Sequence, residues 1–261
     1  MPSVIIDLPG PLWTQDVFSR TEERTKVEMS RSMNGQAFFC SWSGGKDSCL
    51  ALYHAVQAGG RVESLFTMMA EDNRKSRSHG LPKSLIEAQA ERLNVPVSFR
   101  SASWEEYENV FLGMLHEFKG RGIQSGVFGD IDVLSHRKWV KRVCALRRIT
   151  PFHPLWKRNR RELLYEFVDL GFKATIVVVK EDKLGNEFLG RCLDRETISE
   201  LEHSGIDLSG ELGEYHTVVT AGPLFSSEIV IKANRLSKQD GYWFMEVDLD
   251  EKESFMKGEE N

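Results

Sequence analysis

Residues 37–48 read Ala37-Phe38-Phe39-Cys40-Ser41-Trp42-Ser43-Gly44-Gly45-Lys46-Asp47-Ser48. The apolar run at 37–40 predicts a buried strand, and residues 48–56 have the pattern of a helix. A glycine pair at such a junction lets the backbone approach an anion, and the helix directs its free N–H groups and positive dipole end toward that anion. This order of elements predicts a phosphate-binding loop at residues 43–48.

The side chains of this loop suit a polyphosphate. Lys46 supplies a mobile positive charge, and Ser43 and Ser48 supply hydroxyl donors. Asp47 supplies a carboxylate that can hold Mg²⁺ or cap the helix. A Walker A loop has four residues between its glycines and then Gly-Lys-Ser/Thr, whereas Lys46 is followed here by Asp47. The loop is therefore of a different type.

The hexapeptide 43–48 resembles the pyrophosphate loop (PP-loop) of ATP pyrophosphatases. That group includes GMP synthetase, NAD synthetase, argininosuccinate synthetase and tRNA-thiolation enzymes, and it cleaves ATP between the α and β phosphates. The alternative is a Gly-Gly turn whose Ser and Asp side chains only cap a helix. The strand before the loop and the helix after it favour the phosphate site.

Composition indicates an ordinary globular protein. The 261 residues are 41% hydrophobic and 28% charged, with a net charge of -5, so no global attraction to nucleic acid or to an anionic membrane is expected. The most apolar stretch, residues 174–179, is far shorter than the roughly 20 residues of a membrane helix. The four cysteines lack Cys-x-x-Cys spacing, which predicts reduced thiols in a cytoplasmic protein.

Strand-like and helix-like segments alternate in the first part of the chain. The predicted strands are Ala37–Ser41, Val62–Met68, Val97–Arg100 and Gly126–Gly129, and the predicted helices are Ser48–Ala58, Leu81–Leu93, Trp104–Lys119 and Val133–Arg148. This alternation predicts an α/β fold with a Rossmann-like parallel sheet, of the adenine nucleotide alpha hydrolase type. Ligands of such sheets bind beyond the carboxyl ends of the strands, so the loops after Cys40, Met68 and Gly129 are expected to share one site.

The pattern changes after Thr150-Pro151-Phe152-His153-Pro154. A helix at Arg161–Leu170, a strand at Ala174–Val179 and a β-rich region at Glu214–Asp248 predict a smaller α+β subdomain. The predicted division is a loosely packed extension at 1–36 without a signal-peptide pattern, a PP-loop ATP-binding domain at 37–149, a C-terminal substrate subdomain at 150–250 and a frayed tail at 251–261.

Two carboxylates follow the fourth predicted strand, in Gly129-Asp130-Ile131-Asp132. Their position at the carboxyl end favours contact with ribose or Mg²⁺. Capping of the helix that starts near Val133 is the alternative for Asp130 or Asp132. Arg137 lies near the strand end and is expected to reach the polyphosphate, while the other basic residues of its helix are expected to be solvated.

Two further segments carry polar chemistry. His79, in the long loop 70–80, is a candidate for phosphate contact or proton transfer, or else a loop histidine bonded to backbone. The segment 210–217 places two carboxylates, a phenol, an imidazole and a hydroxyl between glycines, which suits proton transfer and binding of a cation. A strand-entry turn with alternating polar residues is the alternative there.

Taken together, the motifs resemble the diphthine–ammonia ligase family over about 37–225. They occur in the order Ser43-Gly44-Gly45-Lys46-Asp47-Ser48, Leu85-x-x-x-Gln89-Ala90 after His79, Arg137 before Val143-Cys144, Pro154-Leu155-Trp156, Leu189-Gly190-Arg191-Cys192-Leu193-Asp194 and Gly210-Glu211-x-Gly213-Glu214-Tyr215-His216-Thr217. That family joins ammonia to the carboxylate of diphthine, a modified histidine on elongation factor 2. The carboxylate attacks the α-phosphate of ATP, pyrophosphate leaves, and ammonia displaces AMP.

The resemblance implies a set of site residues. ATP would be bound by Ser43, Gly44, Gly45, Lys46, Asp47, Ser48, Met68, Gly129, Asp130 and Arg137. Asp47 and Asp130 would hold Mg²⁺. Catalytic roles would fall to Lys46, Asp47, Glu211, Glu214 and His216, and substrate contacts to His79, Tyr215 and Thr217. Ammonium would be the nitrogen source and elongation factor 2 the protein substrate.

Other functions are kept as alternatives. One is a PP-loop ligase for an unknown small carboxylate, because Ala221-Gly222-Pro223 stands where the family usually has Asp-Gly-Pro. Another is a module that binds ATP or AMP without turnover. A tRNA-thiolating enzyme is disfavoured, because such enzymes usually carry catalytic or metal-binding cysteine pairs.

Overall fold

The computed structural model describes residues 33–250. Its first half is a five-stranded parallel sheet in the order β3-β2-β1-β4-β5. The strands are β1 (Ala37–Ser41), β2 (Arg61–Met69), β3 (Val97–Ser101), β4 (Ser125–Val127) and β5 (Thr150–Phe152), and the helices between them are α2 (Lys46–Gln57), α3 (Lys83–Arg92), α4 (Tyr107–Gly120) and α5 (Leu134–Leu146). The predicted Rossmann-like parallel sheet is confirmed.

Side chains of β1 alternate between the two faces of this sheet, as the pleat of a strand requires. Phe38 and Cys40 belong to the buried cluster on the face of α2 and α3. Phe39 belongs to the opposite cluster, where its ring stacks on that of Phe118 with centroids 4.6 Å apart. Both faces of the central strand are therefore buried, which explains its nearly continuous apolar sequence.

The second half is a four-stranded antiparallel sheet in the order β7-β6-β9-β8. Its elements are α6 (Arg160–Asp169), β6 (Lys173–Lys180), the short 3₁₀ helix η1 (Asn186–Phe188), α7 (Arg195–His203), β7 (Tyr215–Ala221), β8 (Ile231–Gln239) and β9 (Tyr242–Leu249). The Asn159 side chain accepts the Glu162 N–H at the start of α6, and Asp194 does the same for Thr197 at α7. These caps set where the two helices begin. The predicted smaller α+β part is confirmed.

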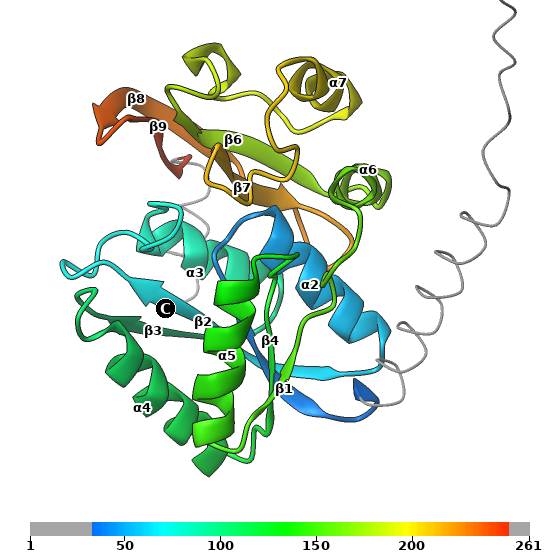
Figure 1. Cartoon of the computed structure of the whole chain (residues 1–261), viewed down its shortest axis with the longest axis vertical. Coiled ribbons are helices and arrows are strands. Elements are labelled where there is room, and N and C mark those ends of the chain that lie inside the picture. The colour runs from blue at the N-terminus through cyan, green and yellow to red at the C-terminus, as the bar shows by residue number, and fades with distance from the viewer. Residues whose placement is uncertain (1–32, 251–261) are drawn as a thin grey trace, which may run out of the picture.

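The layers stack as Figure 1 shows. Helices α4 and α5 cover one face of the parallel sheet, and α2 and α3 lie between that sheet and the antiparallel sheet. Helix α7 lies on the far side of the antiparallel sheet, and α6 lies at its side, where Glu166 pairs with His54 of α2. A single buried cluster includes residues of both halves, among them Leu50 of α2 and Val178 of β6. The two halves therefore share one hydrophobic core.

Three details differ from the sequence-based prediction. Strand β5 pairs with β4 in the parallel sheet, so that sheet extends past the predicted boundary at 149. Helix α7 was not predicted, because its sequence is mostly polar and only Thr197, Ile198 and Leu201 are buried. Met33 is fully buried beside Gly60, so the described end of the predicted loose extension is packed.

Residues 1–32 and 251–261, which hold the rest of the predicted extension and the predicted tail, lie outside the described residues. Within the described part, no helix is both long and apolar enough to cross a membrane.

Candidate active site

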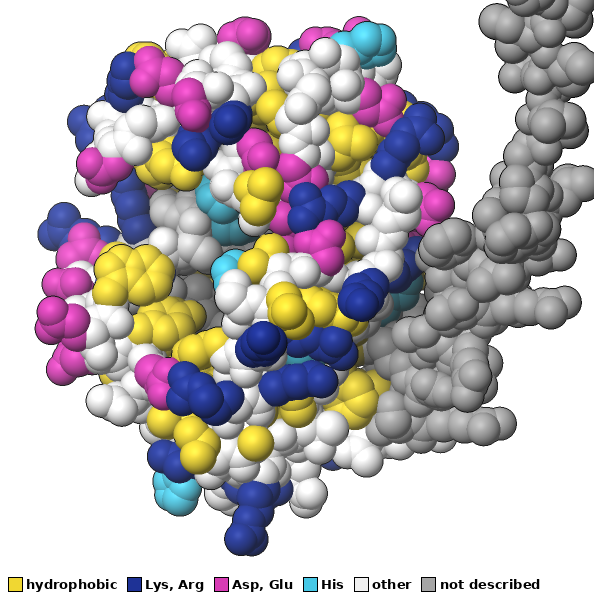
Figure 2. All heavy atoms as spheres, viewed as in Figure 1, with side chains coloured by type: hydrophobic (Ala, Val, Ile, Leu, Met, Phe, Trp, Pro, Cys, Tyr) yellow, Lys and Arg dark blue, Asp and Glu magenta, His cyan; other side chains and the backbone are white. Residues whose placement is uncertain are grey.

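A cavity of about 610 Å³ opens beyond the carboxyl ends of β1, β2 and β4. Strand β1 connects outward to β2 on one side and lies beside β4 on the other, so the cavity occupies the point where the strand order reverses. Figure 2 shows the surface hollowed between the two halves, with histidine side chains inside the hollow. The cavity is lined by the PP-loop, the loop after β2, the loop after β4, the starts of α4 and α5, and four residues before and in β7: Gly210, Glu211, Gly213 and His216.

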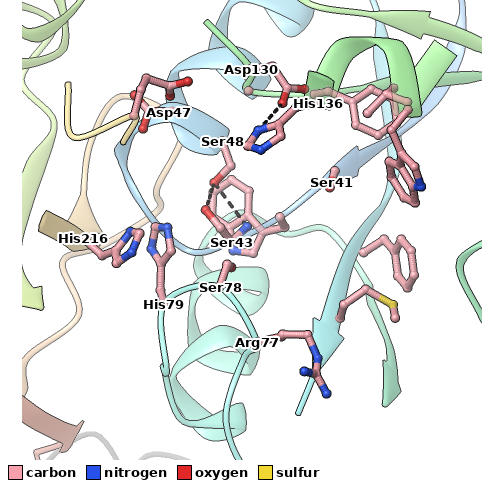
Figure 3. A pocket seen from close by; sticks show the side chains of 18 of the residues that line it. Ser41, Ser43, Asp47, Ser48, Arg77, Ser78, His79, Asp130, His136 and His216 are labelled. Carbon is pink, nitrogen blue, oxygen red and sulfur yellow. Dashed lines mark hydrogen bonds and ion pairs between the residues drawn. The ribbon is translucent and has the colours of Figure 1, made fainter. Parts of the chain in front are cut away.

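The PP-loop is braced by its own hydroxyl groups. The Oγ atoms of Ser43 and Ser48 lie 3.0 Å apart, and Ser48 Oγ donates to the Gly45 carbonyl at 3.1 Å. Gly44 has φ +82°, a conformation that a residue with a Cβ rarely adopts. Ser43, Asp47 and Ser48 line the cavity, so three of the six predicted loop residues face it directly (Figure 3).

Side chains from elsewhere fasten the loop to the antiparallel sheet. The Gly45 N-cap of α2 has no side chain, and Thr217 Oγ1 of β7 accepts the Lys46 N–H at 3.1 Å instead. Fully buried Gln89 donates to the Gly44 carbonyl at 2.9 Å and to the Val219 carbonyl at 2.7 Å. The loop is thus fixed by both halves of the chain.

Lys46 is held in place rather than mobile, which corrects the expectation. Its Nζ donates to the Ser209 carbonyl at 2.5 Å, pairs with Asp47 Oδ2 at 2.6 Å and lies 5.3 Å from the Tyr215 ring centroid. It does not line the cavity, and its side chain is only 6% exposed. The positive charge of Lys46 therefore lies on the side of the loop that faces away from the cavity.

Three residues predicted as substrate or catalytic contacts also lie outside the cavity lining. The Tyr215 hydroxyl donates to the Leu208 carbonyl at 2.5 Å, and Thr217 caps α2. Glu214 is buried and accepts the Leu212 N–H at 3.2 Å. These side chains shape the loop 210–216 and the helix start, and their assignment to substrate or catalytic contact stays a prediction.

Two neighbouring histidines lie beside the loop, with their rings tilted 33° to each other. The rings of His79 and His216 have centroids 4.6 Å apart, and both line the cavity (Figure 3). His79 Nδ1 lies 3.0 Å from the Thr217 carbonyl, which can only accept, so this nitrogen carries the hydrogen. A Cβ on Gly45 would overlap with His79 Cε1, so a larger residue there would displace the His79 ring.

Burial keeps both histidines uncharged. It lowers the pKa of His216 to about 4, with nearby Lys46 as the second cause. Burial, and then His216, lower the pKa of His79 well below its usual value. Neither ring carries a positive charge at neutral pH, so the unprotonated ring nitrogen of each can accept a hydrogen bond.

Three carboxyl groups face the same cavity: Asp47, Asp130 and Glu211. Burial, and then the charge of Asp47, raise the pKa of Glu211 to about 7. Burial likewise raises the pKa of Asp130, whose oxygens lie 3.7 Å from His136 Nδ1 and 3.5 Å from His153 Nε2. A cation bound among these groups would relieve their repulsion.

Asp47 and Asp130 both line the cavity, and Mg²⁺ usually takes one or two protein carboxylates and completes its shell with phosphate oxygens and water. Within 33–250, no group of three or more His, Cys, Asp or Glu side chains is arranged to hold a metal without such help.

The loop after β4 approaches the PP-loop closely. A Cβ on Gly129 would lie 2.9 Å from the Asp47 carbonyl carbon, so only glycine allows this contact. Asp132 pairs with Arg160 at 2.5 Å, and α5 begins after Val133 without a side-chain cap, so the capping alternative for Asp130 and Asp132 is wrong. Gly129 and Asp130 line the cavity as expected, as does Met68 of β2.

Arg137 is not among the side chains that line the cavity, and its expected contact with the polyphosphate stays a prediction. Its guanidinium carbon lies 4.3 Å from the ring centroid of Trp156. The position one helical step before it, His136, faces the cavity instead. The start of α5 lies at the site, as the sequence predicted. The orientation of the helix about its axis turns His136 rather than Arg137 toward the cavity.

An aromatic wall forms the other end of the cavity, and sequence reasoning missed it. It consists of Trp104, Tyr107, Phe111 and Trp139. The rings of Phe111 and Trp139 have centroids 5.0 Å apart, and those of Trp104 and Tyr107 are stacked at 5.8 Å. Tyr107 and Phe111 lie within the predicted helix 104–119, but periodicity alone does not separate a face that covers the sheet from a cavity wall.

A parallel α/β sheet with a Ser-Gly-Gly-Lys-Asp-Ser loop at its switch point defines a nucleotide-binding protein of the PP-loop class. The chain belongs to the diphthamide synthase family: the model of that family's N-terminal domain matches residues 37–149, and the model of its C-terminal domain matches residues 159–253.

Curated relatives carry the same chemistry in their names. The diphthine–ammonia ligase of Danio rerio is 26% identical over 215 residues, which cover 73% of this chain and 84% of the relative. The enzyme of the same name from Homo sapiens is 26% identical over 220 residues, covering 74% and 82%. The chain is accordingly an enzyme, a ligase that forms a carbon–nitrogen bond.

A crystal structure of a predicted subunit of a tRNA methyltransferase from Methanocaldococcus jannaschii aligns with 74% of this chain and 100% of that chain. Identity is 16% and the TM-score is 0.41, values too low to carry any argument.

Proposed function

We propose that this ligase joins ammonia to the carboxylate of diphthine on elongation factor 2 and converts ATP to AMP and pyrophosphate. The observation that carries the proposal is that the PP-loop and the Glu211–His216 loop open into one cavity. ATP and the acceptor carboxylate can meet there. Family membership supports the identity of the two smaller substrates.

In the first step a carboxylate oxygen of the substrate attacks the α-phosphorus of ATP. The bond between the α-phosphorus and its bridging oxygen breaks, and pyrophosphate leaves with the bonding electrons. Ser43, Ser48 and the N-terminus of α2 stabilise the departing charge, with Lys46 close behind. Mg²⁺, held by Asp47 and Asp130, would offset charge on the phosphates.

In the second step the nitrogen of ammonia attacks the acyl carbon of the adenylate. AMP leaves with the electrons of the carbon–oxygen bond, and the attacking nitrogen loses a proton to give the neutral amide. We assign the proton acceptor to Glu211, because a pKa of about 7 suits a base that works at neutral pH. His79 and His216 stay uncharged and do not repel an incoming ammonium ion.

The aromatic wall provides the place for the base of ATP. Tyr107, Phe111 and Trp139 offer ring faces and edges at the end of the cavity away from the acceptor loop. Stacking on aromatic rings binds a purine strongly. The triphosphate then runs from this wall toward Ser43 and Ser48.

The test is product formation from ATP, Mg²⁺ and ¹⁵N-ammonium with elongation factor 2 that carries diphthine. We expect AMP and pyrophosphate in equal amounts and ¹⁵N in the modified residue by mass spectrometry. Factor without the diphthine modification is the control and is expected to give neither product. Tight ATP binding without products would contradict the proposal and favour the ATP-binding module, and turnover with a small carboxylate alone would favour the second alternative.

A further inference from the structure

Large apolar side chains are exposed around the mouth of the cavity. Six such side chains are at least half exposed among residues 33–250. Three of them form what we call the rim: Trp104 at 73%, Leu134 at 56% and Leu212 at 68% exposed. Trp104 lines the cavity, Leu134 precedes the lining residues Ser135 and His136, and Leu212 lies between the lining residues Glu211 and Gly213.

The rim combines three separate parts of the fold. Trp104 comes from the connection between β3 and α4, Leu134 from the first turn of α5, and Leu212 from the loop before β7. A ligand small enough to be enclosed in the cavity would not cover these outward side chains. Apolar side chains gathered around one opening indicate a partner that extends beyond it.

Charges beside the rim have opposite signs on its two sides. Near Trp104 the exposed Glu105 and Glu106 form no ion pair within the described part of the chain. Near Leu134 the exposed Lys138 and Lys141 likewise have no ion-pair partner among the described residues. Positions 134, 138 and 141 share one helical face. Figure 2 shows acidic side chains at the left edge of the hollow and basic side chains gathered over α5.

We propose that the rim docks a loop of the protein substrate, the segment that carries the reacting carboxylate. This inference rests on the proposed function, since it assigns the contacts by which that substrate is selected over a free small molecule. The loop that fits has apolar residues at its shoulders, basic residues toward Glu105 and Glu106, and acidic residues toward Lys138 and Lys141. Its modified side chain enters past Leu212 toward Glu211.

The experiment compares leucines of the full-length chain that differ in position and match in exposure. The rim variant is Leu134→Gln with Leu212→Gln, which keeps the net charge. The control is Leu146→Gln, because Leu146 is 55% exposed at the opposite end of the same helix as Leu134. Binding of diphthine-carrying elongation factor 2 is measured without ATP, and AMP release is measured with the factor and with free diphthine.

We expect the rim variant to raise Kd and KM for the modified factor by about tenfold and to leave AMP release with free diphthine within about twofold of the wild type. The Leu146→Gln control should behave as the wild type with both substrates. An unchanged Kd for the factor would overturn the docking proposal. An equal fall in AMP release with the factor and with free diphthine would also overturn it, since the leucines would then affect the cavity itself.

Failure of the proposed function gives a different result. If the wild-type protein binds the factor through the rim but forms no AMP with either substrate, the ligase chemistry fails and the docking surface stands. If it forms AMP with free diphthine but does not bind the factor, the ligase chemistry stands and the docking surface fails.

The polarity of the rim supplies a second readout. Lys138→Glu with Lys141→Glu should weaken binding of the factor and reduce the loss of affinity on raising salt, because screened attraction is lost. An unchanged salt dependence would remove the charged residues from the docking surface.

Discussion

The two ends of the cavity are built in different ways. The phosphate end is a run of adjacent residues, 43–48, whose backbone is set by a glycine turn and a helix start. The aromatic end combines Trp104 and Tyr107 with Trp139, more than thirty positions away, across α4 and α5. A site made of adjacent residues leaves a sequence motif, whereas a wall made of distant side chains does not.

The two ends of the cavity also differ in how many charged side chains they contain. The phosphate end gathers Lys46, Asp47, Asp130 and Glu211, and burial shifts the pKa of both Asp130 and Glu211 upward. The aromatic end is largely apolar, with Arg77 placed over the Trp104 ring at 4.6 Å. We therefore expect substitutions at the phosphate end to affect chemistry most, and those at the aromatic end to affect nucleotide affinity.

The largest effect is expected for Lys46→Met. This change removes a buried charge beside the loop and leaves Asp47 and the Ser209 carbonyl without their partner. We expect kcat for AMP release to fall by about 10²–10³-fold. Lys173→Met is the matched control, because Lys173 of β6 is an exposed lysine paired with Glu228. If Lys46→Met kept the wild-type kcat, the claim that the phosphate end governs the chemical step would be wrong.

A smaller effect is expected for Trp139→Ala at the aromatic end. Loss of the ring should raise KM for ATP by about tenfold, since stacking of a base on an aromatic ring contributes about 1–3 kcal/mol. Trp139→Phe keeps a ring but also loses the hydrogen bond from Trp139 Nε1 to Glu108. The pair of variants thus separates stacking from that bond. Equal ATP affinity in both variants and the wild type would place the base elsewhere.

The smallest effect is expected in the stability of Glu211→Gln. The pKa of Glu211 is raised to about 7 in the folded state, so the folded protein holds this proton more tightly than the unfolded chain does. Stability from this group is complete below pH 4.5 and is lost as pH rises toward 7. The variant should therefore gain on the order of 1 kcal/mol relative to the wild type at pH 8.

The check is thermal unfolding of both proteins at pH 4 and pH 8, with the exposed Glu105→Gln as control. We expect a difference between Glu211→Gln and the wild type that is larger at pH 8. The same difference at both pH values would mean that the acidic groups of the phosphate end do not oppose folding.

Much of the architecture followed from local patterns. The strand at 37–41, the glycine turn and the helix after it were predicted from adjacent residues, because apolar runs, helical periodicity and the free φ of Gly44 are local properties. The alternation of strands and helices then predicted a parallel sheet and the edge at which Met68, Gly129 and Asp130 meet. These predictions required no knowledge of contacts between distant residues.

The roles of individual side chains depended on the folded chain. Lys46 and Ser209 lie 163 positions apart, and Lys46 and Thr217 lie 171 apart, so no local pattern indicates that the lysine is fixed and its N–H capped. The uncharged state of His216 and the raised pKa of Glu211 arise from burial, which exists only after both halves pack together. Local sequence determines backbone preferences, whereas the direction, burial and charge of a side chain depend on neighbours brought together by packing.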